Sequence, residues 1–200
     1  MTDLSEDVDG RRLRRSQNRD AVLDALVSLF EEGLFQPSSG EIAARAGLSP
    51  RSLFRYFDDV DDLNRAAIER QQERARPLLD VHATPGEPTN SKIDRFVEAR
   101  VRLYETIGPS ARAARVCAHR HPVVAAQVKD GRAYLRHQLS RLFAPELTGD
   151  HGGVLPALDA LCSFETYELL RSDQGLSGSK IITALNSAVS ALLNPPGGTS

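Results

Sequence analysis

The stretch that decides the fold is residues 46–57, AGLSPRSLFRYF, which contains two arginines and three aromatic residues. Ser49 followed by Pro50 marks a helix start, because the serine hydroxyl caps a free backbone N–H and proline has no N–H to leave unpaired. Gly47 ends a preceding short helix over about 39–46, since glycine adopts a left-handed conformation without steric cost. The stretch therefore predicts two short helices joined by a tight turn.

Helical spacing gives the second short helix two faces. The residues expected to face the core are Ile42, Leu48, Leu53 and Phe57. Arg51, Ser52 and Arg55 fall together on the outer face. This pattern is typical of a helix-turn-helix, whose second helix enters the DNA major groove, where the planar fork of arginine donates twice to guanine. A short solvated helix in an ordinary three-helix packing would give the same spacing.

Helical periodicity continues along the chain, and no alternating strand pattern interrupts it. An apolar face with Val22, Leu26 and Phe30 predicts a first helix from about 15 to 32. Further helices are expected at about 61–77, 92–107, 110–119, 122–143, 154–172 and 178–193. The breaker-rich segment 80–90 is the best candidate boundary between two parts. The prediction is an all-α chain of about nine helices.

Composition narrows the class of protein. Apolar residues make up 40% of the chain and charged residues 26%, as in an ordinary folded protein. The acidic start has no secretory signal and no apolar run is long enough to span a membrane, so we expect a cytoplasmic protein without membrane contact. Cys117 and Cys162 lack metal or redox spacing and are interpreted as buried apolar residues. No GxSxG, HExxH or phosphate-binding glycine loop occurs, so we expect neither an enzyme nor a cofactor.

Charge is segregated near the start of the chain. The first ten residues carry four carboxylates and no base, whereas residues 11–57 carry eight arginines against five carboxylates. Arg14 and Arg15, with Arg11 and Arg12, precede the first predicted helix. They form either a flexible arm along the DNA minor groove or a solvated basic tail, and the sequence favours neither.

The run from Ser38 to Leu63, SSGEIAARAGLSPRSLFRYFDDVDDL, resembles the DNA-binding domain of the TetR family of bacterial transcription regulators. The family pattern has Ser or Thr before an Ile-Ala pair, then Ala-Gly, a hydrophobic residue, Ser, an aromatic residue, Phe and Leu. The matching positions here are Ser38, Ile42, Ala43, Ala46, Gly47, Leu48, Ser49, Phe54, Phe57 and Leu63. The downstream helices match the family only in number, length and loop placement.

The resemblance implies a homodimer that binds double-stranded DNA at a palindromic operator, acts as a repressor and responds to a small-molecule effector. It implies a DNA-binding domain at 11–60 and a helical ligand-binding and dimerisation domain at 61–194, between disordered tails at 1–10 and 195–200. The expected DNA contacts are Ser38, Ser49, Pro50, Arg51, Ser52, Phe54, Arg55 and Tyr56, with Arg14 and Arg15.

Two departures from the family pattern concern DNA affinity. The family usually has Tyr at the position of Phe54 and Lys at that of Val60, and both groups donate to phosphates. Here both donors are missing, and four aspartates in 58–62 add negative charge. Because phosphate contacts supply much of the affinity, we expect weaker or differently anchored binding. A dimeric small-molecule-binding module that has lost DNA affinity is the alternative.

The last two long helices carry apolar residues on more than one side. The first stripe comprises Leu155, Leu158, Leu161, Cys162 and Leu169, and the second comprises Ile182, Leu185, Val189 and Leu192. Phe164 and Tyr167 point away from the first stripe. A helix with two apolar surfaces must bury both, and the resemblance implies that helices 154–172 and 178–193 form the dimer interface. A purely intramolecular core is the alternative.

Arg100 lies at the centre of the apolar face of the predicted helix 92–107. A charge in that position needs a partner. One interpretation is an ion pair with Glu165 or Glu168. The other is that Arg100 anchors an anionic or polar group of a ligand, in a site lined by Phe96, Tyr104, Val128 and Tyr167. His119 and His121 do not share a helix face, so we expect no metal site there.

Overall fold

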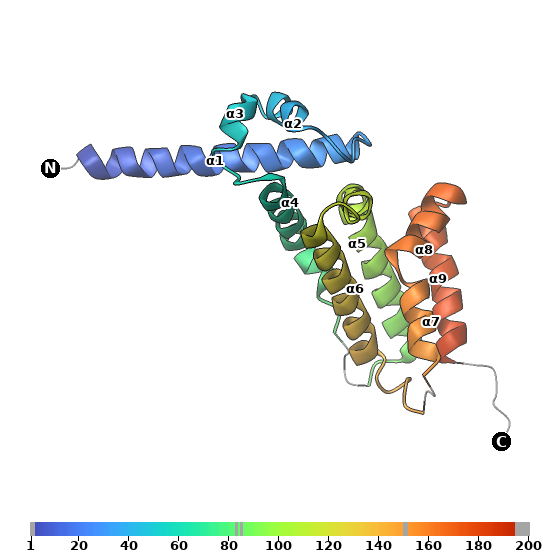
Figure 1. Ribbon diagram of the computed structural model, residues 1–200. Helices are drawn as coiled ribbons and strands as arrows, with labels where there is room; N and C mark the ends of the chain where they lie inside the picture. The colour runs from blue at the N-terminus through green and yellow to red at the C-terminus, as the bar shows by residue number, and fades with distance from the viewer. Residues whose placement is uncertain (1–2, 83, 85, 150–151, 195–200) are drawn as a thin grey trace, which may run out of the picture. The chain divides into compact units, whose positions relative to one another are not determined.

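The computed structural model describes residues 3–82, 84, 86–149 and 152–194 (Figure 1). Across these residues the regular structure is all helical and contains no strand, which confirms the predicted fold class. The α-helices are α1 (Asp3–Glu31), α2 (Ser39–Arg45), α3 (Pro50–Leu53), α4 (Val60–Ala75), α5 (Thr89–Cys117), α6 (Pro122–Leu142), α7 (Val154–Leu161), α8 (Phe164–Glu168) and α9 (Gly178–Leu193). A 3-10 turn, η1 (Arg76–Leu79), follows α4, and a π-helical turn, η2 (Leu169–Asp173), follows α8.

The described residues pack into two compact units. The first contains the residues up to Arg74 together with Gly108–Val128, and the second contains Ala75–Ile107 and the residues from Lys129 onward. The divisions lie at the end of α4, inside α5 and inside α6, and not in the segment 80–90. The end of α5 belongs to the first unit, where Ala113 joins its apolar core.

The core of the first unit joins α1 to the two short helices and to α4. Val22 and Leu26 of α1 pack with Ala43 of α2, Leu53 of α3 and Leu63 of α4 in one buried cluster. Figure 1 shows α2 and α3 lying along α1. The apolar face predicted for the first helix is therefore the side of α1 that supports the helix-turn-helix.

Local hydrogen bonds define the ends of the two short helices. Ser38 and Glu41 form a reciprocal capping box at the start of α2, and Ser49 caps α3 by accepting from the backbone N–H of Ser52. Gly47 has a φ of 70°, a left-handed conformation that a residue with a Cβ rarely adopts. Serine, proline and glycine thus fix the turn as the sequence predicts.

The second unit has an aromatic core. Phe96 of α5 meets Phe143, just after α6, edge to face, with 5.6 Å between the ring centroids. Tyr104 packs on Phe164 and Tyr167 of α8, with centroid separations of 5.5 and 5.6 Å. Phe164 and Tyr167, which were expected to point away from the stripe of Leu155 and Leu158, are both buried in this core.

Two predicted helix boundaries differ from the structure. The helices expected at 92–107 and 110–119 form one helix, α5, which continues through Pro109. The helix expected at 154–172 is divided into α7, α8 and η2. Ser163 caps α8 by accepting from the N–H of Thr166, so it starts a new helix within the apolar stretch. One merger and one division leave the expected number of α-helices unchanged in the described part of the chain.

The first helix starts earlier than predicted. α1 begins at Asp3, so the stretch 3–14, expected to be a disordered tail and a flexible basic arm, is helical. The stretch contains no proline, and extending an existing helix requires no new nucleus. The expected tail at 195–200 lies outside the described residues. None of the described helices combines the length and the apolar character that crossing a membrane requires.

Candidate nucleic-acid interface

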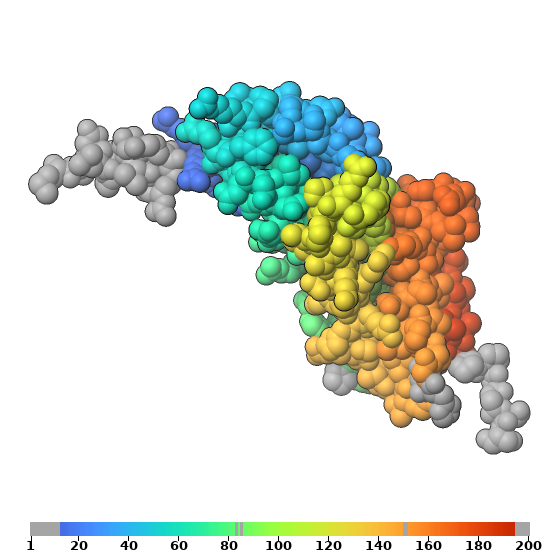
Figure 2. All heavy atoms as spheres, in the orientation of Figure 1, coloured from blue at the N-terminus to red at the C-terminus, as the bar shows by residue number. Residues whose placement is uncertain are grey.

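The side chains of α3 and the turn after it divide as predicted. Leu53 and Phe57 are each 1% exposed and belong to the core of the first unit, whereas Arg51 and Arg55 are exposed. Neither arginine makes an ion pair or side-chain hydrogen bond with any other described residue. The space-filling view shows α2, α3 and the turn between them at the surface of the first unit (Figure 2). The buried residues Leu53 and Phe57 thus fix the backbone that carries the two guanidinium groups, and these groups remain exposed.

The serines predicted to contact DNA are engaged in capping. The hydroxyl groups of Ser49 and Ser52 lie 2.8 Å apart, and the N–H of Ser52 donates to Ser49 Oγ at 3.2 Å. Ser38 Oγ donates to Glu41 Oε2 at 2.7 Å and lowers the pKa of that carboxyl. Pro50, the first residue of α3, is exposed. Each serine keeps a lone pair, but its geometry is set by the helix it caps.

The two predicted aromatic contacts have different surroundings. Phe54 is 47% exposed and has no hydroxyl with which to bind a phosphate. The hydroxyl of Tyr56 accepts from Asn18 Nδ2 of α1 at 2.8 Å, and its ring is partly buried. Arg19 lies over the Phe57 ring, 5.0 Å from its centroid. Phe54 therefore presents an apolar surface, and Tyr56 links the turn after α3 to α1.

Arg14 and Arg15 lie on α1, and both side chains are exposed. A flexible arm and a solvated tail were the two alternatives for these residues, and the structure has a helix at both positions, so α1 carries the two guanidinium groups. A helix presents its side chains at a fixed spacing, so the backbone at these arginines needs no further ordering before they bind. This position suits contacts with the DNA backbone better than insertion into a groove.

The aspartates that follow α3 are bound within the first unit. The backbone N–H of Asp62 donates to Asp59 Oδ1 at 2.7 Å, and that of Asp58 donates to Asp62 Oδ2 at 3.2 Å. His121 Nδ1 donates to Asp61 Oδ1 at 2.6 Å. These carboxylates cap α4 and fasten it to the start of α6. Sequence reasoning missed this role, although an acidic residue three positions before another at a helix start is a recognisable cap.

A second set of ion pairs joins α4 to α1. Arg70 donates to Asp20 Oδ1 and to Asp24 Oδ1, both at 2.8 Å, and Arg74 donates to Asp24 Oδ1 at 3.0 Å. Exposed ion pairs contribute little stability individually, about 0–1 kcal/mol each. As a bridge of two arginines they fix the orientation of α4 against the helix that supports α3.

In the second unit, Arg100 is 4% exposed and has neutral hydrogen-bond partners. Its Nη2 donates to Gln138 Oε1 at 2.8 Å, and Gln138 Nε2 donates to the carbonyl of Leu79 at 2.6 Å. The guanidinium lies 4.8 Å from the centroid of the Phe96 ring. The expected ion pair with Glu165 or Glu168 is wrong, since Arg100 has no carboxylate partner among the described residues.

Four of the five predicted ligand residues are brought together in the second unit. Phe96, Arg100, Tyr104 and Tyr167 are all buried there, and the hydroxyl of Tyr104 donates to the carbonyl of Cys162 at 2.7 Å. Burial raises the pKa of Tyr104, so its hydroxyl stays protonated. The fifth residue, Val128, belongs to the first unit. Sequence reasoning missed Gln138, because helical spacing does not say which residue of another helix faces Arg100.

Metal binding has no support in the described part of the chain, where no three His, Cys, Asp or Glu side chains are grouped as metal ligands. Cys117 and Cys162 are free thiols. Cys162 is buried as predicted, whereas Cys117 is only partly buried.

Comparison with known proteins identifies the fold class. No protein-family model matches the sequence, and neither does any curated protein. A TetR-like transcriptional regulator from Rhodococcus sp. RHA1 superposes with a TM-score of 0.71 at 22% identity, over 90% of this chain and 97% of that one. A second regulator from the same source has a TM-score of 0.71 at 20% identity, over 88% and 95% of the two chains. A TetR-family regulator from Streptomyces coelicolor has a TM-score of 0.68 at 18% identity, over 88% and 80%.

The chain therefore has the fold of the TetR-family transcriptional regulators. The likeness extends over most of both chains in each pair, so it covers the downstream helices as well as the helix-turn-helix. The resemblance first indicated by the run from Ser38 to Leu63 is thus supported by solved structures.

Proposed function

We propose that this chain is a sequence-specific DNA-binding transcriptional regulator. The observation that carries the proposal is the pair of exposed arginines, Arg51 on the short helix α3 and Arg55 in the turn after it, on a segment whose Leu53 and Phe57 are buried. Both guanidinium groups lack ion-pair partners among the described residues, so no internal contact has to be broken before they bind. Arginine on a helix in the major groove reads guanine through two parallel hydrogen bonds.

The remaining contacts follow from the surface around α3. Ser38, Ser49, Ser52, Pro50 and Tyr56 border the arginines and approach the sugar-phosphate backbone, and the Phe54 ring packs against a sugar. Arg14 and Arg15 of α1 add phosphate contacts. The start of α4 disfavours a bound phosphate, because its aspartates carry negative charge and already accept from the free N–H groups there. The phosphate contacts that anchor the protein on DNA are therefore made by α1 and not by α4.

A homodimer would offer two such reading helices to a palindromic operator. The apolar residues that the second unit leaves exposed or only partly buried support this assembly. They include Leu169 in η2 and Ile182 and Leu192 in α9, whereas Leu158, Leu185 and Val189 fill the core. Residues of both predicted stripes are thus divided between an inner and an outer surface.

An effector site in the second unit would make the regulator responsive. Burying a guanidinium without a carboxylate is costly, and a ligand carboxylate that replaced Gln138 would supply the missing anion. Binding would act through α4, whose ion pairs with α1 transmit a change of tilt to α3. Such coupling is typically about 1–3 kcal/mol, and release from the operator on effector binding would make the protein a repressor.

The effector proposal has a direct test in an Arg100→Met variant. In a thermal-shift screen of small carboxylates, we expect the wild type to gain stability with at least one compound and the variant to lose that response. A variant that keeps every response of the wild type would remove Arg100 from the site.

The DNA-binding proposal is tested by selecting bound sequences from a random duplex pool. We expect an enriched palindrome, because a symmetric dimer reads two half-sites. The alternative, a ligand-binding dimer with lost DNA affinity, is favoured by the acidic start of α4. It predicts no enrichment, and equal affinity for selected and random duplexes at both low and high salt.

A further inference from the structure

The first unit contains a cavity of about 230 Å³ that none of the functions above uses. All four helices from α1 to α4 contribute to its wall, together with the end of α5 and the turn before α6. The buried part of the wall is apolar and consists of Leu26, Phe30, Ile42, Leu53 and Leu63. The cavity therefore borders the core that supports the reading helix α3.

The rim of this cavity is cationic. Arg120 lines it, is exposed, and makes no ion pair or side-chain hydrogen bond with any described residue. His121 also lines it, and because its Nδ1 is held by Asp61, only Nε2 remains for another group. No residue of the wall is an aspartate or glutamate. The rim thus offers positive charge beside an apolar space, which complements a ligand with one negative group.

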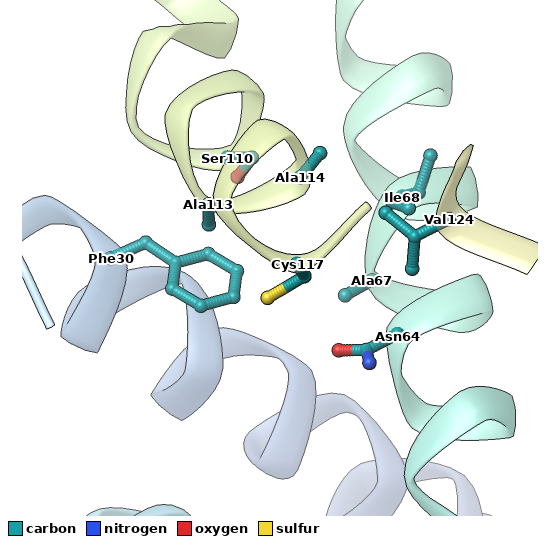
Figure 3. A pocket seen from close by; sticks show the side chains of 9 residues that line it. All are labelled: Phe30, Asn64, Ala67, Ile68, Ser110, Ala113, Ala114, Cys117 and Val124. Carbon is teal, nitrogen blue, oxygen red and sulfur yellow. The ribbon is translucent and has the colours of Figure 1, made fainter. Parts of the chain in front are cut away.

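The volume limits the size of the ligand. An apolar cavity of about 150 Å³ admits benzene, so this larger cavity accommodates one ring or a short branched chain with a small substituent. A separate pocket of about 20 Å³ adjoins it and shares Phe30, Asn64 and Cys117 (Figure 3). Ser110 lines this small pocket, and its buried Oγ has no hydrogen-bond partner. A pocket of this size holds a single water and not a ligand.

We propose that the larger cavity is a binding site for a small monocarboxylate with an aromatic or short branched apolar body. The apolar body contacts Phe30 and Leu53, and the carboxylate accepts hydrogen bonds from the guanidinium of Arg120. This site is independent of Arg100 and of the second unit. It also stands whether or not the chain binds DNA, although an occupant that touches Leu53 would contact α3 itself.

The chain carries its own reporter for this site. Cys117 lines the cavity and is partly exposed, whereas Cys162 is 2% exposed and burial raises its pKa to about 12. Burial also raises the pKa of Cys117, so a thiol reagent such as DTNB is best applied at mildly alkaline pH. Under those conditions only Cys117 reacts in the folded chain, and a ligand in the cavity shields it.

Benzoate is the test probe, with benzamide as its uncharged analogue of the same shape. We expect benzoate to slow the modification of Cys117 in a saturable way, and the Arg120→Gln variant to weaken the protection by benzoate about tenfold. Benzamide should protect weakly and to the same extent in both proteins. Arg141→Gln removes an exposed arginine of the second unit and should change neither result.

A second variant tests the cavity itself. Val60 lies on its wall and is 46% exposed, so Val60→Phe narrows the cavity without disturbing the core. It should reduce protection by benzoate, while circular dichroism and melting temperature stay at wild-type values. The proposal is overturned if benzoate gives no saturable protection, or if its protection is unchanged in either Arg120→Gln or Val60→Phe. Because DNA is absent from the assay, neither outcome depends on the regulator function.

Discussion

Buried charges in the second unit are stabilised in two different ways. Lys92 is 5% exposed, and its Nζ lies 2.7 Å from Glu146 Oε1, which also accepts from Thr89 at 2.9 Å. Burial alone would raise the pKa of Glu146, but the hydrogen bonds from Lys92, the backbone and Thr89 outweigh it and lower the pKa. Arg100 has no such carboxylate partner. Lys92 is therefore neutralised within the unit, whereas the hydrogen-bond partners of Arg100 among the described residues, Tyr104 and Gln138, are uncharged.

The Glu146 pKa leads to a prediction for acid stability. A carboxyl whose pKa is lower in the folded state stabilises the fold above its unfolded pKa of about 4.5, and this contribution is lost as the pH falls through the folded pKa. We expect the wild type to lose more of its free energy of unfolding between neutral and acidic pH than a Lys92→Met/Glu146→Leu variant. Urea unfolding at several pH values measures the difference. Equal losses in the two proteins would show that the pair has no such role.

Single residues were predicted best where one helix determines their environment. The exposure of Arg51 and Arg55 and the burial of Leu53 follow from spacing within one short segment. The burial of Arg100 follows in the same way from α5. Its partner does not, because Gln138 comes from another helix, and only the packing of the two helices brings the side chains together.

The short helix α2 depends on the hydrogen bonds at its ends. Ser38 satisfies a free N–H at the start of α2, and Glu41 reaches back to the N–H of Ser38 at 2.7 Å. Because α2 has only seven residues, its caps are a large part of the interactions that keep it helical.

Removal of this cap should lower stability measurably. We expect Ser38→Ala to reduce the free energy of unfolding by about 1 kcal/mol. Ser39→Ala, one residue further on, removes a hydroxyl for which no hydrogen bond is formed with the described residues, and it serves as the control. Chemical denaturation of both variants decides the point, and an equal effect of the two substitutions would contradict the capping role.

The predicted helix boundaries differed from the structure where a break signal was overridden by packing or a start signal was overlooked. Gly108-Pro109 suggested a break, but α5 continues through it. Proline removes only one backbone hydrogen bond, and residues of α5 both before and after it, such as Tyr104 and Ala113, are buried. Ser163 gave a start signal within an apolar stretch that periodicity alone assigned to one helix. Periodicity therefore identified the faces of the helices more reliably than their ends.

The start of α4 leads to a prediction of increased affinity. Phe54 and Val60 are both exposed and lack the phosphate donors that the TetR-family pattern has at these positions. If α3 lies in the major groove, Phe54→Tyr and Val60→Lys should each strengthen binding to DNA of any sequence. Val60→Lys should also steepen the salt dependence of the affinity by about one unit, since it adds one phosphate contact. Val60→Gln controls for the change in side-chain size and should leave the salt dependence unaltered.

At the scale of the whole molecule, the first unit exposes Arg51 and Arg55 beside a buried core, and the second unit leaves apolar residues such as Leu169 exposed. The all-α fold and the helix-turn-helix were predictable, because short motifs with strong turn chemistry define them. The division into two units was not, since it depends on how the ends of α5 and α6 pack in three dimensions. The cavity beside Arg120 could not be predicted from the sequence either, because its wall comes from five separate segments.

The proposed function depends most on the exposed arginines of α3 and the turn after it, and their effect on DNA specificity is the most direct test. The quantity to measure is the ratio of affinities for a selected palindrome and a random duplex at fixed salt. We expect Arg51→Ala and Arg55→Ala each to lower this discrimination by about 1–3 kcal/mol, and the control Arg141→Ala to leave it unchanged. If both arginine variants keep the discrimination of the wild type, this surface does not read DNA and the proposed function is contradicted.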